Sequence, residues 1–352
     1  MTVLGKRPYQ PQPTTKGRIS VHPEGDHIID QHGRLFDYVR IAVNERCNLR
    51  CIYCLPEEGI DFLPSEQLLT SQEIIRIVHI LAQLQVTKVR FTGGEPLLRK
   101  DMAHLVSQAS ITPGIESVHI TTNGLLLSEY ANDLYKAGLH GINISLDTMD
   151  RQKFLKITRS DCLDKVLEGL NLALSLPFPS VKVNVVVMRD FNHEEIGDFV
   201  ELTRDNRLTV RFIELMPFDA HQIWKTGKFF GAEKILEYLS GLYPHMDEEE
   251  GSVTEEHVYR IPGHEGKFAV IPSFTRSLCE GCNRIRLTAD GKIRNCLYSD
   301  NEFDVKKLAR QGDSHEKIAD LFKRAMWTKL KDGWEAQHRG NHLRESMTQI
   351  GG

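Results

Sequence analysis

The chain has 352 residues, of which 40% are hydrophobic and 26% are charged, so it can bury a sizeable core without disulfide bonds. Its 44 Lys and Arg against 48 Asp and Glu give a net charge of −4, which argues against binding nucleic acid or membrane by bulk charge. No stretch approaches the roughly 18 uninterrupted apolar residues that a membrane span needs.

Residues 1–33 are expected to form a flexible N-terminal tail. Prolines at positions 8, 11 and 13 and a single short apolar patch, Val3-Leu4, fit neither a secretory signal nor an amphipathic transit helix. The expected location is therefore the cytoplasm, where thiols stay reduced. In a reducing compartment, clustered cysteines are more often metal ligands than disulfide partners.

Short β-rich runs, each followed by a helical pattern, recur along the first two thirds of the chain. The predicted strands are 39–44, 88–92, 117–122, 141–147, 181–188 and 208–215. Such alternation predicts parallel strands with crossover helices, in either an α/β barrel or an open doubly wound sheet. The pattern alone does not separate the two, and because six units are too few for an eight-fold barrel, an incomplete (β/α)6 TIM-type barrel over residues 34–217 is one of the possibilities. Residues 218–352 are predicted to form a second, C-terminal α+β domain.

Several local signals define individual elements. Thr70 and Glu73 form a capping-box pattern ahead of a helix with one apolar face, and Gly138 is expected to end a helix over 128–137. A short helix is predicted near 231–241. The acidic run from Asp247 to Glu256 is expected to be a solvated surface. Cys162, which has no partner in sequence, is interpreted as an ordinary free cysteine.

The first cysteine group lies in the loop after the first predicted strand. Cys47, Cys51 and Cys54 supply three thiolates within eight residues. A four-iron cluster held by three cysteines keeps one iron open to a small molecule. The alternative is a structural zinc site, which would need a fourth Cys or His nearby, and none lies between His32 and His79.

The second group is Cys279, Cys282 and Cys296. Asp290-Gly291 predicts a hairpin turn that would bring Cys296 back beside Cys282 and complete another three-cysteine site. Zinc is again the alternative, with His257 or His264 as a fourth ligand. Two such groups favour two iron–sulfur clusters.

Basic side chains stand inside otherwise apolar strands. Lys88 and Arg90, for example, share the face opposite Val89 and Phe91. The full set is Lys88, Arg90, Lys182, Arg211, Arg284 and Arg286. Buried charges are costly unless they are paired or bind a ligand. Converging on a barrel interior, these would suit a small polyanion; alternatively, each pairs with an interior acid such as Glu214 or Asp147.

The run Cys-Asn-Leu-Arg-Cys-Ile-Tyr-Cys at 47–54, followed by Gly-Gly-Glu-Pro at 93–96, resembles the signature of radical S-adenosylmethionine (SAM) enzymes. The resemblance implies a partial TIM barrel, in which a [4Fe-4S] cluster binds SAM and cleaves it to a 5′-deoxyadenosyl radical. By the same resemblance, SAM would contact Tyr53, Gly94, Ser145 and Met216.

The second cysteine group, within Cys-Glu-Gly-Cys-Asn-Arg-Ile-Arg at 279–286, and the terminal Gly351-Gly352 narrow the resemblance to the GTP 3′,8-cyclase family of molybdenum cofactor biosynthesis. The resemblance implies two [4Fe-4S] clusters, with guanine at the open iron of the second. It assigns catalytic roles to Arg284, Arg286, Gly351 and Gly352. It assigns GTP contacts to Arg40, Lys88, Arg90, Thr121, Lys182, Arg211, Arg284 and Arg286.

The implied reaction converts GTP to 3′,8-cyclo-7,8-dihydro-GTP, through hydrogen abstraction at the ribose 3′ carbon and attack on carbon 8 of guanine. Implied partners are an electron donor of unknown identity and the downstream cyclic pyranopterin monophosphate synthase, and a homodimer is one expected assembly. Three alternatives stay open: a radical enzyme acting on a peptide, an RNA-modifying radical enzyme, and a non-catalytic module stabilised by zinc or iron–sulfur.

Overall fold

A computed structural model describes residues 27–216, 226–249, 256–275, 279–339 and 346–350 of the chain. Within these ranges, twelve strands form one sheet in the order β12-β11-β10-β1-β2-β3-β4-β5-β6-β9-β8-β7. The two ends of this order, β12 and β7, are edges rather than neighbours, so the sheet is open. No helix of the described segments is long and apolar enough to cross a membrane.

The strands are β1 (Tyr38–Ala42), β2 (Lys88–Thr92), β3 (Ser117–Thr122), β4 (Gly141–Ser145), β5 (Ser180–Val187), β6 (Leu208–Glu214), β7 (Asp247–Glu248), β8 (His257–Arg260), β9 (Lys267–Ile271), β10 (Arg284–Leu287), β11 (Lys292–Arg294) and β12 (Glu302–Asp304). The helices are α1 (Ser71–Gln83), α2 (Met102–Ser110), α3 (Leu127–Lys136), α4 (Arg151–Thr158), α5 (Leu163–Ser175), α6 (Ile196–Glu201), α7 (Ala232–Leu242), α8 (Val305–Arg310), α9 (His315–Trp327) and α10 (Gly333–Arg339).

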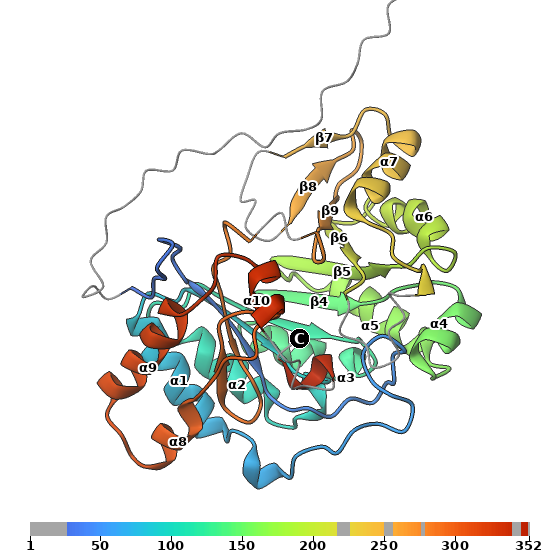
Figure 1. The fold of residues 1–352 in the computed structure, drawn as a ribbon. Helices are drawn as coiled ribbons and strands as arrows, with labels where there is room; N and C mark the ends of the chain where they lie inside the picture. The colour runs from blue at the N-terminus through green and yellow to red at the C-terminus, as the bar shows by residue number, and fades with distance from the viewer. Residues whose placement is uncertain (1–26, 217–225, 250–255, 276–278, 340–345, 351–352) are drawn as a thin grey trace, which may run out of the picture.

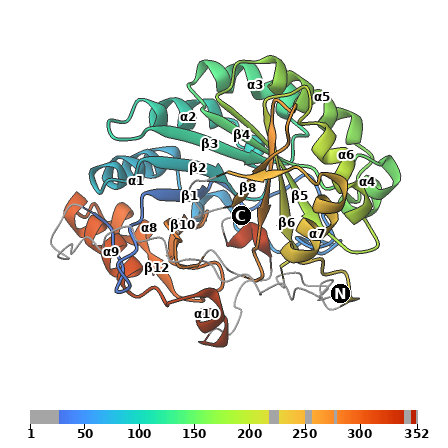
Figure 2. The same ribbon diagram turned by 90° about the horizontal axis from the view of Figure 1, so that it is seen from above.

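The six predicted strands are confirmed as β1 to β6, each paired in parallel with the next. Seen from above, helices α1 to α6 form an arc outside the curved sheet (Figure 2). Fully buried apolar side chains fill the layer between them, among them Ile74 and Ile77 of α1. This is the incomplete TIM-type barrel that the family resemblance implies, and it is one of the two folds that the alternation allows.

The C-terminal part of the chain extends both edges of this sheet. β10 pairs in parallel with β1, and β11 and β12 follow it as an antiparallel meander. At the opposite edge, β9 pairs in parallel with β6 and carries β8 and β7 (Figure 1). The C-terminal extension therefore flanks the barrel on two sides. The expected boundary near residue 217 lies where the described chain is interrupted, and the division into domains stays a prediction.

Residues 27–33 differ from the expected flexible tail. Ile28 is fully buried, Ile29 bridges to Leu35, and the buried Asp30 carboxylate pairs with Arg34 at 2.5 Å. Packing therefore begins before the expected boundary at residue 34. Residues 1–26 lie outside the described chain.

Two local predictions are confirmed in detail. The Thr70 hydroxyl accepts from the Glu73 N–H while the Glu73 carboxylate accepts from the Thr70 N–H, which completes the capping box of α1. Gly138 follows α3 at a φ of +86°, the left-handed conformation that favours glycine after a helix. The turn at Asp290-Gly291 also joins β10 to β11 as predicted.

Candidate functional site

The first cysteine loop is held against the end of β2 by backbone contacts. A Cβ added to Gly94 would stand 2.2 Å from the Arg46 carbonyl oxygen, and one added to Gly93 would stand 2.4 Å from that of Asn44. The N–H of Gly94 donates to the Asn44 carbonyl at 3.0 Å. The two glycines are thus required for close approach of the loop that carries Cys47, a role that sequence reasoning did not assign to them.

Glu95 connects this loop to the next strand. Its buried carboxylate accepts from the Asn123 N–H at 2.7 Å and the Thr122 hydroxyl at 2.7 Å, and the Asn123 amide lies 3.7 Å from the Cys47 sulfur. Burial raises the pKa of Glu95 to about 7, against the lowering effect of the N–H donors of Asn123 and Leu97. The carboxyl group therefore fixes the ends of β2 and β3 beside the first cysteine group.

The second cysteine group stands where β10 begins. Asn283 donates to Asp37 at 2.7 Å, which ties the start of β10 to the residue before β1. Burial opposes ionisation of the Cys282 thiol, but the charges of Lys329 and Arg284 outweigh it and lower its pKa to about 6. The surroundings of Cys282 therefore favour negative charge on its sulfur, whereas burial raises the pKa of Cys279.

Both cysteine groups line one cavity of about 360 Å³ at the carboxyl ends of the parallel strands. Its walls also include most of the residues that the resemblance assigns to SAM and GTP. These are Tyr53, Gly94, Ser145, Met216, Arg40, Arg90, Thr121, Arg211, Arg284 and Arg286. The structure thus brings together predicted residues from segments more than 200 residues apart in the chain.

The donor set of the first group, three cysteine side chains in one loop, is of the kind that holds an iron–sulfur cluster. Burial, followed by repulsion from neighbouring thiolates, raises the pKa of Cys51 well above its usual value and that of Cys54 to about 12. Three thiolates packed in this way need a cation to offset their charge. Among the described residues, no three His, Cys, Asp or Glu side chains converge as a single metal ion would require.

The expected fourth zinc ligands lie elsewhere. His257 on β8 contacts Glu248 at 3.3 Å, and the His264 ring contacts the Thr203 hydroxyl at 2.8 Å. Neither histidine is among the residues that line the cavity. The described geometry therefore gives no support to a zinc site completed by either histidine.

The sheet register aligns the basic residues in two rows across β10, β1 and β2. Arg40 is paired with Arg286 on one side and Arg90 on the other, and Tyr38 is paired in the same way with Arg284 and Lys88. Neighbouring strands lie about 4.8 Å apart, so these cations crowd one another. The rows form a strongly positive wall that a polyanion would neutralise.

Tyr38, which sequence reasoning missed, separates these charges. Its fully buried ring lies 4.6 Å from the Lys88 ammonium and 5.2 and 5.5 Å from the guanidinium groups of Arg90 and Arg40. An aromatic face attracts cations and so partly offsets their repulsion. Burial, followed by the charges of Arg40 and Arg284, lowers the pKa of Arg286 to about 9.

Two expectations about acidic residues are wrong. Glu256, expected on a solvated surface, is largely buried; its carboxylate pairs with Lys182 at 2.7 Å and Arg211 at 3.2 Å. The acids proposed as interior partners do not fill that role: Glu214 accepts from the N–H of Ala232 and Asp147 from the hydroxyl of Tyr53. Of the predicted GTP contacts, Lys88 and Lys182 are not among the residues that line the cavity.

The SAM candidates Tyr53, Gly94, Ser145 and Met216 line the same cavity. Tyr53 donates to Asp147 at 2.6 Å, and burial raises the pKa of Asp147 to about 6 despite this bond. Ser346 donates to the Cys54 carbonyl at 2.9 Å, so the described C-terminal residues lie against the first cysteine group. Gly351 and Gly352 lie outside the described residues.

Residues that the sequence motifs did not reveal complete the site. Asn184 and Asn143 accept from Arg211 at 2.8 and 3.0 Å and orient its guanidinium group. Asn184 follows Lys182 with the alternation of a strand, which is a signal that periodicity could have used. Lys329, from the loop after α9, had no signal of this kind.

Comparisons with known proteins agree with this geometry. Residues 41–203 match the model of the Radical SAM superfamily, and residues 208–334 match Molybdenum Cofactor Synthesis C. The chain is 46% identical to the GTP 3′,8-cyclase of Chlorobaculum tepidum, over 92% of this chain and 97% of that protein. It is 39% identical to the mitochondrial GTP 3′,8-cyclase of Arabidopsis thaliana, over 92% of this chain and 82% of that one.

Among solved structures, Streptococcus suis SuiB bears the same fold, with a TM-score of 0.61 and 15% identity over 86% of this chain and 72% of that one. SuiB bound to S-adenosylmethionine gives a TM-score of 0.58 and 15% identity over 83% and 69% of the two chains. At this identity the likeness concerns the fold alone, whereas the sequence relatives extend over nearly the whole chain. The chain therefore belongs to the GTP 3′,8-cyclase family, within the radical S-adenosylmethionine superfamily.

Proposed function

We infer that this protein catalyses the radical SAM-dependent cyclisation of GTP to 3′,8-cyclo-7,8-dihydro-GTP, the first step of molybdenum cofactor biosynthesis. The observation that carries this inference is the single cavity lined by two three-cysteine groups and a wall of arginines. A nucleoside triphosphate is the kind of small polyanion that such a wall would hold. Membership of the cyclase family supports the same substrate.

Two iron–sulfur clusters are part of the proposal. Cys47, Cys51 and Cys54 would hold the first, which with SAM supplies the hydrogen-abstracting radical when bound. Cys279, Cys282 and Cys296 would hold the second. Their placement on one cavity supports both assignments, because substrate and cofactor must meet within it.

The chain's own residues bind and orient the substrate. Arg286, Arg40 and Arg90 present donors in adjacent register positions, so successive phosphate oxygens can each accept from a guanidinium group. Thr121 of β3 adds a hydroxyl group to the cavity wall. Arg211 is oriented by its two asparagines. The resemblance also assigns GTP contacts to Lys88 and Lys182, which do not line the cavity in this structure; Lys182 is paired with Glu256 at 2.7 Å.

The remaining assignments follow from the family resemblance. Tyr53, Gly94, Ser145 and Met216 would contact SAM, and the Gly351-Gly352 tail would enter the site and assist catalysis. The burial of Thr348 at the cavity wall supports the tail's approach. We further propose cytoplasmic location, an external one-electron donor and transfer of product to cyclic pyranopterin monophosphate synthase, and homodimerisation as one assembly to be tested.

Anaerobic reconstitution tests the function directly. The protein is loaded with iron and sulfide, then given SAM and a reductant with and without GTP, and the products are measured by mass spectrometry. We expect 5′-deoxyadenosine and a cyclised GTP isomer to rise together only with GTP. If 5′-deoxyadenosine forms while GTP stays intact, the proposed radical chemistry is supported but GTP is not the substrate.

The arginine wall is tested by replacing Arg284 and Arg286 together with alanine. We expect GTP binding, measured by calorimetry without SAM, to weaken by at least a hundredfold, because each charged hydrogen bond contributes about 1.5–3 kcal/mol. The matched control replaces Arg204 and Arg260, whose side chains are 54% and 51% exposed. Unchanged GTP affinity in the R284A/R286A protein would contradict the substrate assignment.

A further inference from the structure

Lys329 is a buried cation of the cavity wall that neither the cysteine motifs nor the proposed substrate contacts include. Its side chain is 4% exposed, and it shares the wall with Cys279, Cys282 and Cys296. Its ammonium donates to the carbonyl of Asn295, the residue before Cys296. Within the described residues, this ammonium forms no ion pair with a carboxylate.

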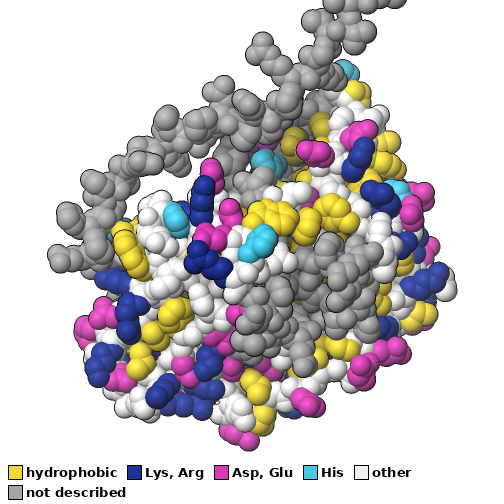
Figure 3. Space-filling view, in the orientation of Figure 1, with side chains coloured by type: hydrophobic (Ala, Val, Ile, Leu, Met, Phe, Trp, Pro, Cys, Tyr) yellow, Lys and Arg dark blue, Asp and Glu magenta, His cyan; other side chains and the backbone are white. Residues whose placement is uncertain are grey.

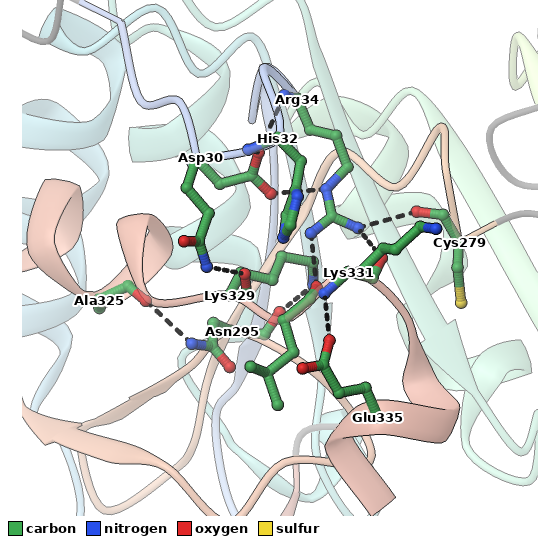
Figure 4. A network of polar contacts seen from close by, with 11 residues as sticks. Asp30, His32, Arg34, Cys279, Asn295, Ala325, Lys329, Lys331 and Glu335 are labelled. Atoms are coloured by element: carbon green, nitrogen blue, oxygen red, sulfur yellow. Dashed lines mark hydrogen bonds and ion pairs between the residues drawn. The ribbon is translucent and has the colours of Figure 1, made fainter.

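The position of Lys329 is fixed by a second buried cation, Arg34. Arg34, paired with Asp30, donates to the carbonyl oxygens of Leu330 at 2.7 Å and Lys331 at 2.8 Å, directly after Lys329. The same guanidinium group donates to the Cys279 carbonyl at 3.0 Å. Figure 4 shows this network joining the N-terminal segment, the cysteine loop and the loop after α9.

Both ends of the second cysteine group are thus tied to the Lys329 segment. Arg34 connects it to Cys279, and the Lys329 ammonium itself connects it to the residue beside Cys296. The Asn295 amide in turn donates to the Ala325 carbonyl of α9 at 3.0 Å. These contacts fix the position of the Lys329 ammonium relative to the second cysteine group, as a functional charge requires.

The placement of Lys329 directs its charge to the cysteine site. Burying an ammonium is unfavourable unless an anion lies nearby. Lys329 lines the same cavity as Cys279, Cys282 and Cys296, and it donates to the carbonyl of the residue before Cys296. A cluster bound by these three cysteines would supply the negative charge that the buried ammonium lacks.

We propose that Lys329 is a positioning residue for the second iron–sulfur site, whose ammonium offsets the negative charge of the cluster and raises its reduction potential. The inference rests on the proposed second cluster. One-electron reduction by an external donor adds one negative charge to the cluster, and a fixed cation nearby stabilises that reduced form. Arg34 acts through Lys329 and Cys279 by holding their backbones in place.

The test compares K329M, which keeps length and removes charge, with K329R, which keeps the charge. Both are made in the full-length chain with Cys47, Cys51 and Cys54 replaced by alanine, so that the second site alone binds iron. Iron content and an EPR-monitored redox titration are measured for each. We expect K329M to reduce the equilibrium constant for reduction at least tenfold, about 59 mV for one electron, and K329R to stay near the Lys329 protein.

Loss of iron from K329M but not from K329R would also support the proposal, since charge would then be needed to retain the cluster. A loaded K329M site with an unchanged potential would overturn it. Equal effects of K329M and K329R would overturn it as well, because they would indicate packing rather than charge. Absence of iron when Lys329 is present would instead refute the second cluster, and with it this inference.

Discussion

Glu256 occupies two of the cations that the substrate is proposed to use, so its removal should strengthen GTP binding. Its carboxylate pairs with Lys182 at 2.7 Å and with Arg211 at 3.2 Å, and its side chain is 11% exposed. A triphosphate that takes these donors must displace the carboxylate. Substituting glutamine leaves a neutral acceptor and removes the competing charge.

The magnitude follows from the two contacts. A hydrogen bond between charged groups contributes about 1.5–3 kcal/mol, and the glutamine oxygen would keep roughly half of that at each donor. The relief is then about 1.5–3 kcal/mol in total, or about ten- to a hundredfold in Kd. Free E256Q should be less stable than the unmodified protein, because two buried cations lose their partner.

Calorimetric titration with GTP, without SAM or reductant, measures the effect. E249Q is a matched control, because Glu249 also bridges two cations, Arg260 at 2.5 Å and Lys267 at 2.8 Å, at the β7–β9 edge of the sheet. E249Q should leave the Kd for GTP unchanged. Weaker or unchanged GTP binding by E256Q would refute the idea that the carboxylate competes with the triphosphate.

Two further substitutions distinguish effects on the first cysteine site from effects on the stability of the fold. G94A places a methyl group 2.2 Å from the Arg46 carbonyl oxygen, so the first cysteine loop must move. We expect the G94A protein to lose iron from the first site and to form no 5′-deoxyadenosine. Full retention of both would contradict the close-packing argument. T70A removes the α1 capping box and should lower the free energy of unfolding, measured in urea, by about 1 kcal/mol. The cyclisation activity should be unchanged. An unchanged free energy of unfolding would show that the cap does not stabilise the protein.

The strands could be predicted, and the cysteine groups could be recognised, because their signals are local. Alternating apolar residues mark β2 and β5, and the close spacing of Cys47, Cys51 and Cys54 is visible in one short loop. The hairpin at Asp290-Gly291 follows from turn chemistry alone. Each of these predictions needs only residues that are neighbours along the chain.

The contacts that could not be predicted join distant segments. Nothing near Glu256 in the sequence indicates that it turns inward to Lys182, since the acidic residues before it read as a solvated loop. Arg34 lies 245 residues from Cys279, and only the pairing of β1 with β10 brings them together. Likewise, the glycines after β2 are required because the backbone of residues 44–46 packs against them, and intrinsic conformational propensity does not reveal such a contact.

The mixed surface and the concentrated interior charge explain how a net acidic chain can bind a polyanion. On the face shown in Figure 3, Lys and Arg side chains stand among Asp and Glu, so the coloured residues form no continuous basic patch. The positive charge that matters is instead stacked in register on β10, β1 and β2, around the Tyr38 ring. Like charges on adjacent strands weaken the sheet, so an anion bound there stabilises the junction between the barrel and its C-terminal extension. With the proposed GTP contacts, substrate binding and the integrity of this junction depend on the same arginines and should therefore be coupled.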